Sequence, residues 1–207
     1  MLGLALSLLV ATAPVVFGGG TAKRVACLGD STTATNVYSN PTYPQRLETL
    51  LVAPGWRVTN FGVGGNTSSQ ILSRWESDIK GKGYTHLVFF GGINDFNQGS
   101  TTAAAVWANL QTIYTEAKAA GMTVVIMSIL PEHASAFWTS DIQSRIAALT
   151  ALIVAGVPAS DYLDLYAAMG DTDPTYLKSA WDSGDGLHPN QTGSNQMATL
   201  VKAKISP

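Results

Sequence analysis

The sequence contains one cysteine, three histidines and few charged residues, and each scarcity excludes a class of protein. Cys27 cannot form an internal disulfide, and its place in an apolar run predicts a buried structural thiol. The Cys/His spacing typical of a zinc site is absent. Charged residues make up only 13% of the chain, with 12 Lys and Arg against 14 Asp and Glu. With a net charge of -2, neither nucleic acid nor an anionic membrane is an obvious partner.

Apolar residues, by contrast, make up 46% of the 207 residues, which argues against disorder and suits one domain with a substantial core. No linker, repeat or low-complexity tract divides the chain from residue 21 onwards. We therefore predict a single domain over residues 21–207.

The first twenty residues form an apolar segment with two interpretations. Its length suits the apolar region of a signal peptide, but no Lys or Arg precedes Lys23, so the usual basic start is missing. Pro14 interrupts the run, which is also short for a membrane span. Residues 1–20 are either a signal-like segment or an extension packed on the domain or on another subunit. Secretion and a cytoplasmic location both remain open, as does the oligomeric state, and no stable membrane insertion is expected.

From Lys23 onwards, apolar runs alternate with helical patterns. Strands are predicted at 24–28, 56–61, 86–90, 122–130 and 161–165, and helices at 43–52, 67–79, 101–120, 140–155 and 190–205. This alternation indicates βαβ units, and the almost wholly apolar strands indicate a sheet covered on both faces. We predict an α/β fold, a three-layer α/β/α sandwich with a mostly parallel five-stranded sheet.

Ligands of such sheets bind at the carboxyl ends of the strands, so reactive groups are expected in the loops that follow the strands. Ser31 follows the first strand, and its hydroxyl is a weak nucleophile unless a base accepts its proton. His188 is the candidate base. Asp185, three residues earlier in "DGLHPN", can orient the imidazole and stabilise its charged form.

Acyl transfer also needs hydrogen-bond donors for the negatively charged oxygen of the tetrahedral intermediate. The Asn94 amide, in "GGIND" after the third strand, is one candidate. The backbone N–H of Gly65, in "GVGGNTS" after the second strand, is another, because glycine allows a close approach of the main chain. The backbone N–H of Ser31 is a third. Asp95 is expected to brace the loop.

Four short motifs occur in order, each in a loop of this kind: "GDS" at 29–31, "GGNT" at 64–67, "GIND" at 92–95 and "DGLHP" at 185–189. Together they resemble the four signature blocks of the SGNH hydrolases, also called GDSL esterases. The resemblance extends from Val25 to Ala203, although the first block reads "GDSTT" and lacks the leucine of the family name.

The resemblance implies a role for each matched residue. Ser31 would be the nucleophile, His188 the base and Asp185 its orienting partner, with Ser31, Gly65 and Asn94 forming the oxyanion hole. It also implies a serine esterase without a metal or organic cofactor. The expected substrates are short-chain, mainly acetyl, esters, and a carbohydrate O-acetylesterase is the leading natural class.

Aromatic and apolar residues in the loops are candidates for the substrate pocket: Phe137, Trp138, Trp181 and Leu187. His133 lies in the same region and is interpreted as a solvated loop histidine. The sequence has no inserted segment long enough for a lid, which favours a shallow pocket.

The sequence leaves two other functions open and argues against two more. A lipase-like or thioesterase-like enzyme for longer acyl chains, and a non-catalytic carbohydrate-binding module on the same fold, remain alternatives. The stretch "NFGVGGNTSSQ" imitates the dinucleotide-binding pattern G-x-G-x-x-G but has Thr67 at the third glycine. The G-x-S-x-G motif of the α/β-hydrolase fold does not occur.

Overall fold

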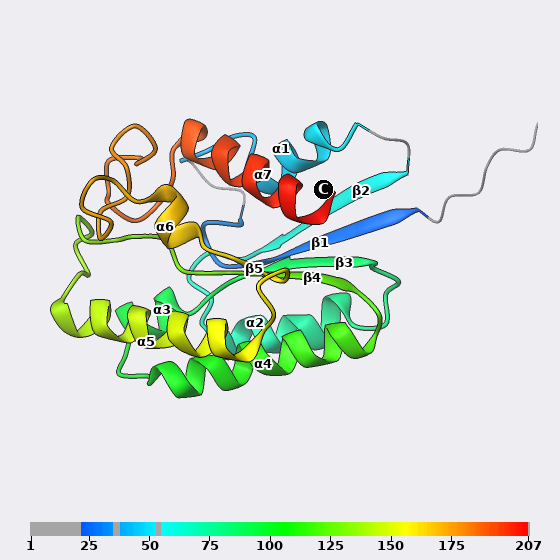
Figure 1. Ribbon diagram of the computed structural model, residues 1–207, viewed down its shortest axis with the longest axis horizontal. Helices are drawn as coiled ribbons and strands as arrows, with labels where there is room; N and C mark the ends of the chain where they lie inside the picture. The colour runs from blue at the N-terminus through cyan, green and yellow to red at the C-terminus, as the bar shows by residue number, and fades with distance from the viewer. Residues whose placement is uncertain (1–21, 35–37, 53–54, 207) are drawn as a thin grey trace, which may run out of the picture.

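A computed structural model describes residues 22–34, 38–52 and 55–206. These residues form three layers, with a central sheet between two groups of helices (Figure 1). The predicted three-layer α/β fold is therefore confirmed. The apolar segment 1–20 lies outside the described residues.

The sheet has five strands, all parallel to their neighbours, in the order β2-β1-β3-β4-β5. The strands are β1 (Lys23–Gly29), β2 (Trp56–Gly62), β3 (His86–Phe89), β4 (Thr123–Met127) and β5 (Tyr162–Leu163). Their carboxyl ends share one edge, at the left of Figure 1, with the loops that carry the four motifs. The strand order reverses between β1 and β3, which is where ligands of open α/β sheets usually bind.

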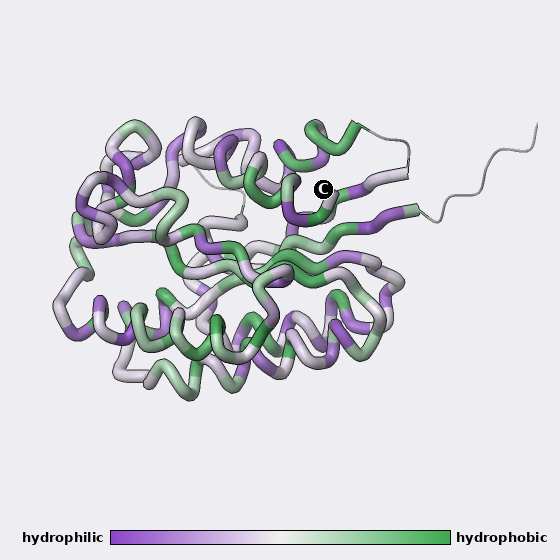
Figure 2. Tube along the Cα trace, in the orientation of Figure 1, coloured by the Kyte–Doolittle hydropathy of each residue, from purple (hydrophilic) through white to green (hydrophobic). Residues whose placement is uncertain are grey.

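Successive residues of each strand face opposite sides of the sheet and so build two cores. In β1, Ala26 and Leu28 join one cluster of buried residues, whereas Val25 and Cys27 join the other. The central strands β3 and β4 are accordingly mostly green, that is apolar, in Figure 2. Cys27 is fully buried, and this burial raises the pKa of its thiol to about 12, which confirms the prediction of a structural cysteine.

Helices cover both faces of the sheet. One face is covered by α1 (Tyr43–Leu50) and α7 (Gln191–Ile205), and the other by α2 (Ser68–Arg74), the π-helix η1 (Trp75–Ile79), α4 (Ala103–Ala119) and α5 (Ser140–Gly156) (Figure 1). Two short helices, α3 (Ile93–Asn97) and α6 (Leu165–Met169), follow β3 and β5. None of the described helices is long and apolar enough to cross a membrane.

Some element boundaries differ from the predicted ones. The strand predicted at 161–165 is shorter, because the Asp164 side chain accepts a hydrogen bond from Ala167 N and starts α6 at Leu165. The helix predicted at 67–79 divides at Trp75, where α2 gives way to η1. Trp75 is only 1% exposed and donates its indole N–H to Glu116 on α4. That contact fixes the second half of the segment against the neighbouring helix.

Candidate active site

Ser31, His188 and Asp185 form a continuous hydrogen-bonded relay. His188 Nε2 lies 2.8 Å from Ser31 Oγ, and His188 Nδ1 lies 2.7 Å from Asp185 Oδ2. With its proton on Nδ1, the imidazole donates to the carboxylate and presents an unprotonated nitrogen to the serine hydroxyl. This arrangement can remove the proton from Ser31.

The turn after β1 holds Ser31 at the edge of the sheet. Thr33 N and Ala34 N both donate to the Asp30 carbonyl oxygen, and Thr32 N donates to Asp30 Oδ1 at 3.1 Å. β2 approaches this turn so closely that a Cβ at Gly62 would lie 2.1 Å from Ala34 N. Only glycine fits there, so the end of β2 packs directly against the turn that carries the serine.

A second tight loop holds Asp185 and His188. Asp185 Oδ1 accepts hydrogen bonds from His188 N at 2.8 Å, from Leu187 N at 3.0 Å and from the hydroxyl of Ser183. Gly186 has a positive φ of 69°, and a Cβ there would lie 2.3 Å from the carbonyl carbon of Ala134. The loop is therefore pinned by its own carboxylate and by the segment that follows β4.

Asp185 is held as an anion by these contacts. Partial burial by itself raises the pKa of the Asp185 carboxyl, but the hydrogen bonds from His188 and Leu187 and the charge of His188 outweigh it and lower the pKa to about 2. An ionised carboxylate at this position stabilises a proton on the imidazole.

Asn94 lies at the start of α3, and its side-chain amide is oriented at both ends. Nδ2 donates to the Asn66 carbonyl oxygen at 3.0 Å, while Oδ1 accepts from Gln98 Nε2 at 3.2 Å. Because an amide group has two N–H donors, one remains for a ligand. Gly65 precedes Asn66 and adopts a positive φ of 76°. A Cβ at the neighbouring Gly64 would lie 3.9 Å from Ser31 Cβ, so this turn also adjoins the serine.

Asp95 braces the loop, as predicted from the sequence. It is 5% exposed, and its two carboxylate oxygens accept from Ser68 N at 2.7 Å and from Ser68 Oγ at 2.8 Å. These two hydrogen bonds fasten the loop after β3 to the first turn of α2.

Arg74 is an organising residue that the motifs do not reveal. Its guanidinium donates to the carbonyl oxygens of Gly29 and Phe61 and, at 2.7 Å, to Asn66 Oδ1. One side chain therefore joins the ends of β1 and β2 to the loop that orients Asn94. The sequence signal is a single arginine in the predicted helix 67–79, which by itself resembles any surface cation.

Asp30, beside the serine, is fully buried, and one of its carboxylate oxygens is buried without a hydrogen-bond partner among the described residues. Burial raises the pKa of this carboxyl to about 6, against the opposing effects of the Thr32 N–H and of His188. Asp30 is thus a second acidic group close to the relay.

The predicted pocket residues differ in their exposure. Trp181 and Leu187 are partly buried and pack against the two cores, whereas Phe137 is 53% exposed. Trp138 stacks on His133 with ring centroids 3.8 Å apart. His133 lies in a loop, as predicted, but its ring is held by this stack and is only partly exposed to solvent.

The opposite face of the same imidazole group meets Tyr176. His133 and Tyr176 have ring centroids 4.3 Å apart, and Thr175 Oγ1 lies 2.7 Å from His133 Nδ1. The segments 131–139 and 171–178 therefore share an aromatic stack. Ala134, which contacts Gly186, connects this stack to the loop of His188.

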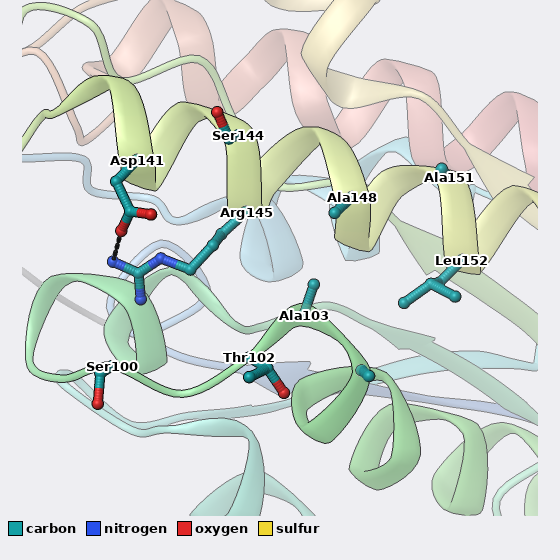
Figure 3. A pocket seen from close by; sticks show the side chains of 10 residues that line it. Ser100, Thr102, Ala103, Asp141, Ser144, Arg145, Ala148, Ala151 and Leu152 are labelled. Atoms are coloured by element: carbon teal, nitrogen blue, oxygen red, sulfur yellow. Dashed lines mark ion pairs between the residues drawn. The ribbon is translucent and has the colours of Figure 1, made fainter.

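A groove of about 820 Å³ lies between the start of α4 and α5 (Figure 3). Its walls are mainly small apolar side chains such as Ala103, Ala148 and Ala151, and an ion pair between Asp141 and Arg145 at 2.8 Å closes one end. None of the relay residues lines this groove. The reactive groups are instead gathered at the carboxyl edge of the sheet.

Comparison with known proteins gives one family match and many structural ones. Residues 27–195 match the model of the GDSL-like lipase/acylhydrolase family. No curated protein matches the sequence.

Several crystal structures share the fold. A GDSL-like lipase from Bacteroides thetaiotaomicron is 26% identical with a TM-score of 0.69, and the match covers 88% of this chain and 87% of the other. The lipase/acylhydrolase from Enterococcus faecalis is 22% identical with a TM-score of 0.70, covering 88% and 95%. A catalytic mutant of the acetylxylan esterase Axe2 from Geobacillus stearothermophilus is 19% identical with a TM-score of 0.70, covering 90% and 95%. The last two show similarity of fold alone.

Proposed function

The chain belongs to the GDSL-like lipase/acylhydrolase family and is a carboxylic ester hydrolase, and from this premise we propose that Ser31, His188 and Asp185 are its catalytic triad. The observation that carries the proposal is the relay of 2.8 Å and 2.7 Å contacts through the two nitrogens of His188. It joins a hydroxyl, a base and an orienting carboxylate in the order that acyl transfer requires.

In the first half of the proposed reaction, Ser31 Oγ attacks the ester carbonyl carbon while its proton moves to His188 Nε2. The carbonyl π electrons move to oxygen and form a tetrahedral oxyanion. Collapse of this intermediate breaks the bond to the leaving alcohol, which takes the proton from His188. The product of this half is an acyl-Ser31 ester.

In the second half, His188 accepts a proton from water, and the resulting hydroxide attacks the acyl carbon. The intermediate collapses, the bond to Ser31 Oγ breaks, and His188 returns its proton to the serine. Free acid and unmodified enzyme result. No cofactor is needed in either half.

The proposed oxyanion hole consists of the backbone N–H groups of Ser31 and Gly65 and the side-chain amide of Asn94. Its support is the prior orientation of that amide by Asn66 and Gln98. Donors that are already fixed need no reorganisation when charge develops, which is the usual source of their effect on rate.

We propose that the preferred acyl groups are short, from acetyl to butyryl. The helices and strands occupy most of the described chain, and the longest connections at the edge of the sheet, residues 128–139 and 170–190, are loops rather than an inserted domain. A hydrophobic acyl groove would make kcat/KM rise with chain length, by about 0.8 kcal/mol for each methylene buried.

Acetylated carbohydrate is the natural class that we favour. Sugar rings stack on exposed aromatic faces, and the loop after β4 carries the exposed ring of Phe137 close in sequence to Ala134, which contacts Gly186. Axe2, which shares the fold, is an acetylxylan esterase. An enzyme for longer acyl chains, or a non-catalytic carbohydrate-binding protein, is the alternative.

Hydrolysis of p-nitrophenyl esters from acetyl to dodecanoyl tests the proposal. We expect the highest kcat/KM between acetyl and butyryl, a decline beyond that, and a loss of nearly all hydrolysis in Ser31→Ala with the fold retained. A maximum at octanoyl or longer would assign the protein to the lipase-like alternative, and an inactive wild type would favour the binding protein. Release of acetate from acetylated xylooligosaccharides tests the carbohydrate class.

A further inference from the structure

The His188 ring has both of its nitrogens engaged in the plane of the ring. Nδ1 faces Asp185 and Nε2 faces Ser31. These two contacts fix the edge of the imidazole but leave its two faces open to other groups. A side chain that covers a face can therefore act on the histidine without competing for either hydrogen bond.

Tyr38 covers one of these faces. The two ring centroids are 4.4 Å apart and the ring planes are within 8° of parallel. Tyr38 comes from the segment between β1 and α1, far from His188 in the sequence but only seven residues after Ser31. The same short stretch of chain thus supplies the proposed nucleophile and the ring that covers the proposed base.

Burial of apolar surface does not account for the position of Tyr38. The residue remains 39% exposed, whereas the His188 side chain is only 12% exposed. The stack therefore leaves much of Tyr38 in solvent, while the histidine that it covers is largely shielded. Its position points to an effect on His188.

We propose that Tyr38 is a positioning residue for the reaction, and that its aromatic face stabilises the imidazolium formed when His188 accepts the proton of Ser31. This inference rests on the proposed function. The face of an aromatic ring carries negative charge density and attracts a cation placed above it within about 6 Å of the centroid. Neutral imidazole gains less from the same contact, so the stack favours the charged form that appears during proton transfer.

Tyr38 could affect the protonation of His188 in two opposite ways, and the direction in which the pH profile moves distinguishes them. If Tyr38 acts through its aromatic face, its removal makes His188 harder to protonate, and the acidic limb of the pH profile of kcat/KM moves to lower pH. If Tyr38 only excludes water, its removal exposes the ring to solvent and the limb moves to higher pH. The other acidic groups facing His188 are Asp185 on its own loop and Asp30 at the end of β1. Both remain in every variant.

The experiment compares Tyr38→Leu, which removes the aromatic face, with Tyr38→Phe, which keeps it and removes only the hydroxyl. For Tyr38→Leu we expect kcat on p-nitrophenyl acetate to fall roughly 2- to 30-fold, with KM changed less than twofold. The acidic limb should move down by about half a pH unit or more. Tyr38→Phe should restore most of the rate and the position of the limb. Thermal unfolding of both variants controls for loss of structure.

An unchanged kcat in Tyr38→Leu, or an acidic limb that stays in place or moves to higher pH, overturns the inference. A rise in KM alone would also overturn it, since Tyr38 would then be a wall of the substrate site. A different result would show that the proposed function itself is wrong. Ser31→Ala would retain activity, whatever the Tyr38 variants do.

Discussion

At the scale of single residues, the candidate site is defined by which atoms of each side chain are already engaged. Asp185 uses Oδ1 for the backbone of its own loop and Oδ2 for His188. Asn94 is held by one N–H and by its oxygen, which leaves its second N–H for a ligand. Most polar atoms of these two side chains thus hold the site together, and the second N–H of Asn94 is left to bind a ligand.

Asn94 should act mainly in the transition state. Loss of its amide in Asn94→Ala is expected to lower kcat by roughly 10²–10³-fold with little change in KM, because the oxyanion forms only after attack. Steady-state kinetics on p-nitrophenyl acetate measure this split. An increase in KM without a fall in kcat would instead assign Asn94 to binding of the ground state.

Glu132 should make stability depend on pH. It is fully buried, one carboxylate oxygen accepts from Asn97 at 3.2 Å, and the other has no partner among the described residues. Burial raises the pKa of this carboxyl to about 7, despite the hydrogen bonds from Asn97 and Ser135. Since the folded-state pKa is raised from 4.5, the contribution of Glu132 to stability is full below pH 4.5 and is lost as the pH rises through 7.

Glu132→Gln removes the ionisation and keeps the shape. At pH 4 its free energy of unfolding should match that of the wild type, and at pH 8.5 it should exceed the wild-type value by on the order of 2–3 kcal/mol. Urea unfolding at the two pH values makes the comparison. Asp30, whose pKa is raised in the same direction, is present in both proteins and cancels. If the variant and the wild type had equal free energies of unfolding at both pH values, ionisation of Glu132 would not destabilise the fold.

The motifs predict individual residues better than they predict contacts. Ser31, His188 and Asp185 were identified because their roles require particular atoms in particular loops, and the structure brings all three together. Tyr38 and Arg74 were not, because their partners lie on segments remote in sequence. No local pattern signals such contacts.

At the scale of elements, α7 connects the loop of His188 to the body of the protein. Asn190 is the N-cap of α7, and its side-chain oxygen accepts from Thr192 N at 2.9 Å and Gly193 N at 3.0 Å. Its amide also donates to the carbonyl oxygens of Ala180 and Asp182. The start of the helix and the loop before it are therefore fastened by one side chain, two residues after His188.

Asn190→Ala should lower the free energy of unfolding by about 1–3 kcal/mol, because it loses the cap and both donations. Asn190→Ser keeps a capping oxygen and loses only the donations, so it should recover about 1 kcal/mol of that loss. Urea unfolding measures both. Since His188 lies in the fastened loop, kcat should follow the same order. Equal stability of the two variants would mean that the cap contributes nothing.

Most elements follow from sequence periodicity, and the exceptions have local causes. The long helices α4 and α5 lie close to their predicted ranges because each combines an apolar face with a capping threonine, Thr102 and Thr139. The short helices α3 and α6 have five residues each, too few for a periodic pattern. The change to a π-helix at Trp75 depends on packing against α4, which the segment itself does not encode.

At the scale of the whole molecule, parallel strands bring distant loops to one edge. Ser31 follows β1 and Asn94 follows β3, the two strands between which the order reverses. The general location of the site was therefore predictable from alternating strands and helices. Substrate identity was not, because it depends on how the segments 131–139 and 171–178 pack against each other, as in the His133 stack.

The central claim is that this architecture activates Ser31 alone among the serines. A fluorophosphonate reacts covalently with a serine that has an adjacent base, so intact-mass and peptide mass spectrometry locate the nucleophile directly. We predict one adduct per chain, at Ser31, no adduct in Ser31→Ala, and slower labelling in Asp185→Asn. Labelling of another serine, or an adduct that persists in Ser31→Ala, would contradict the account.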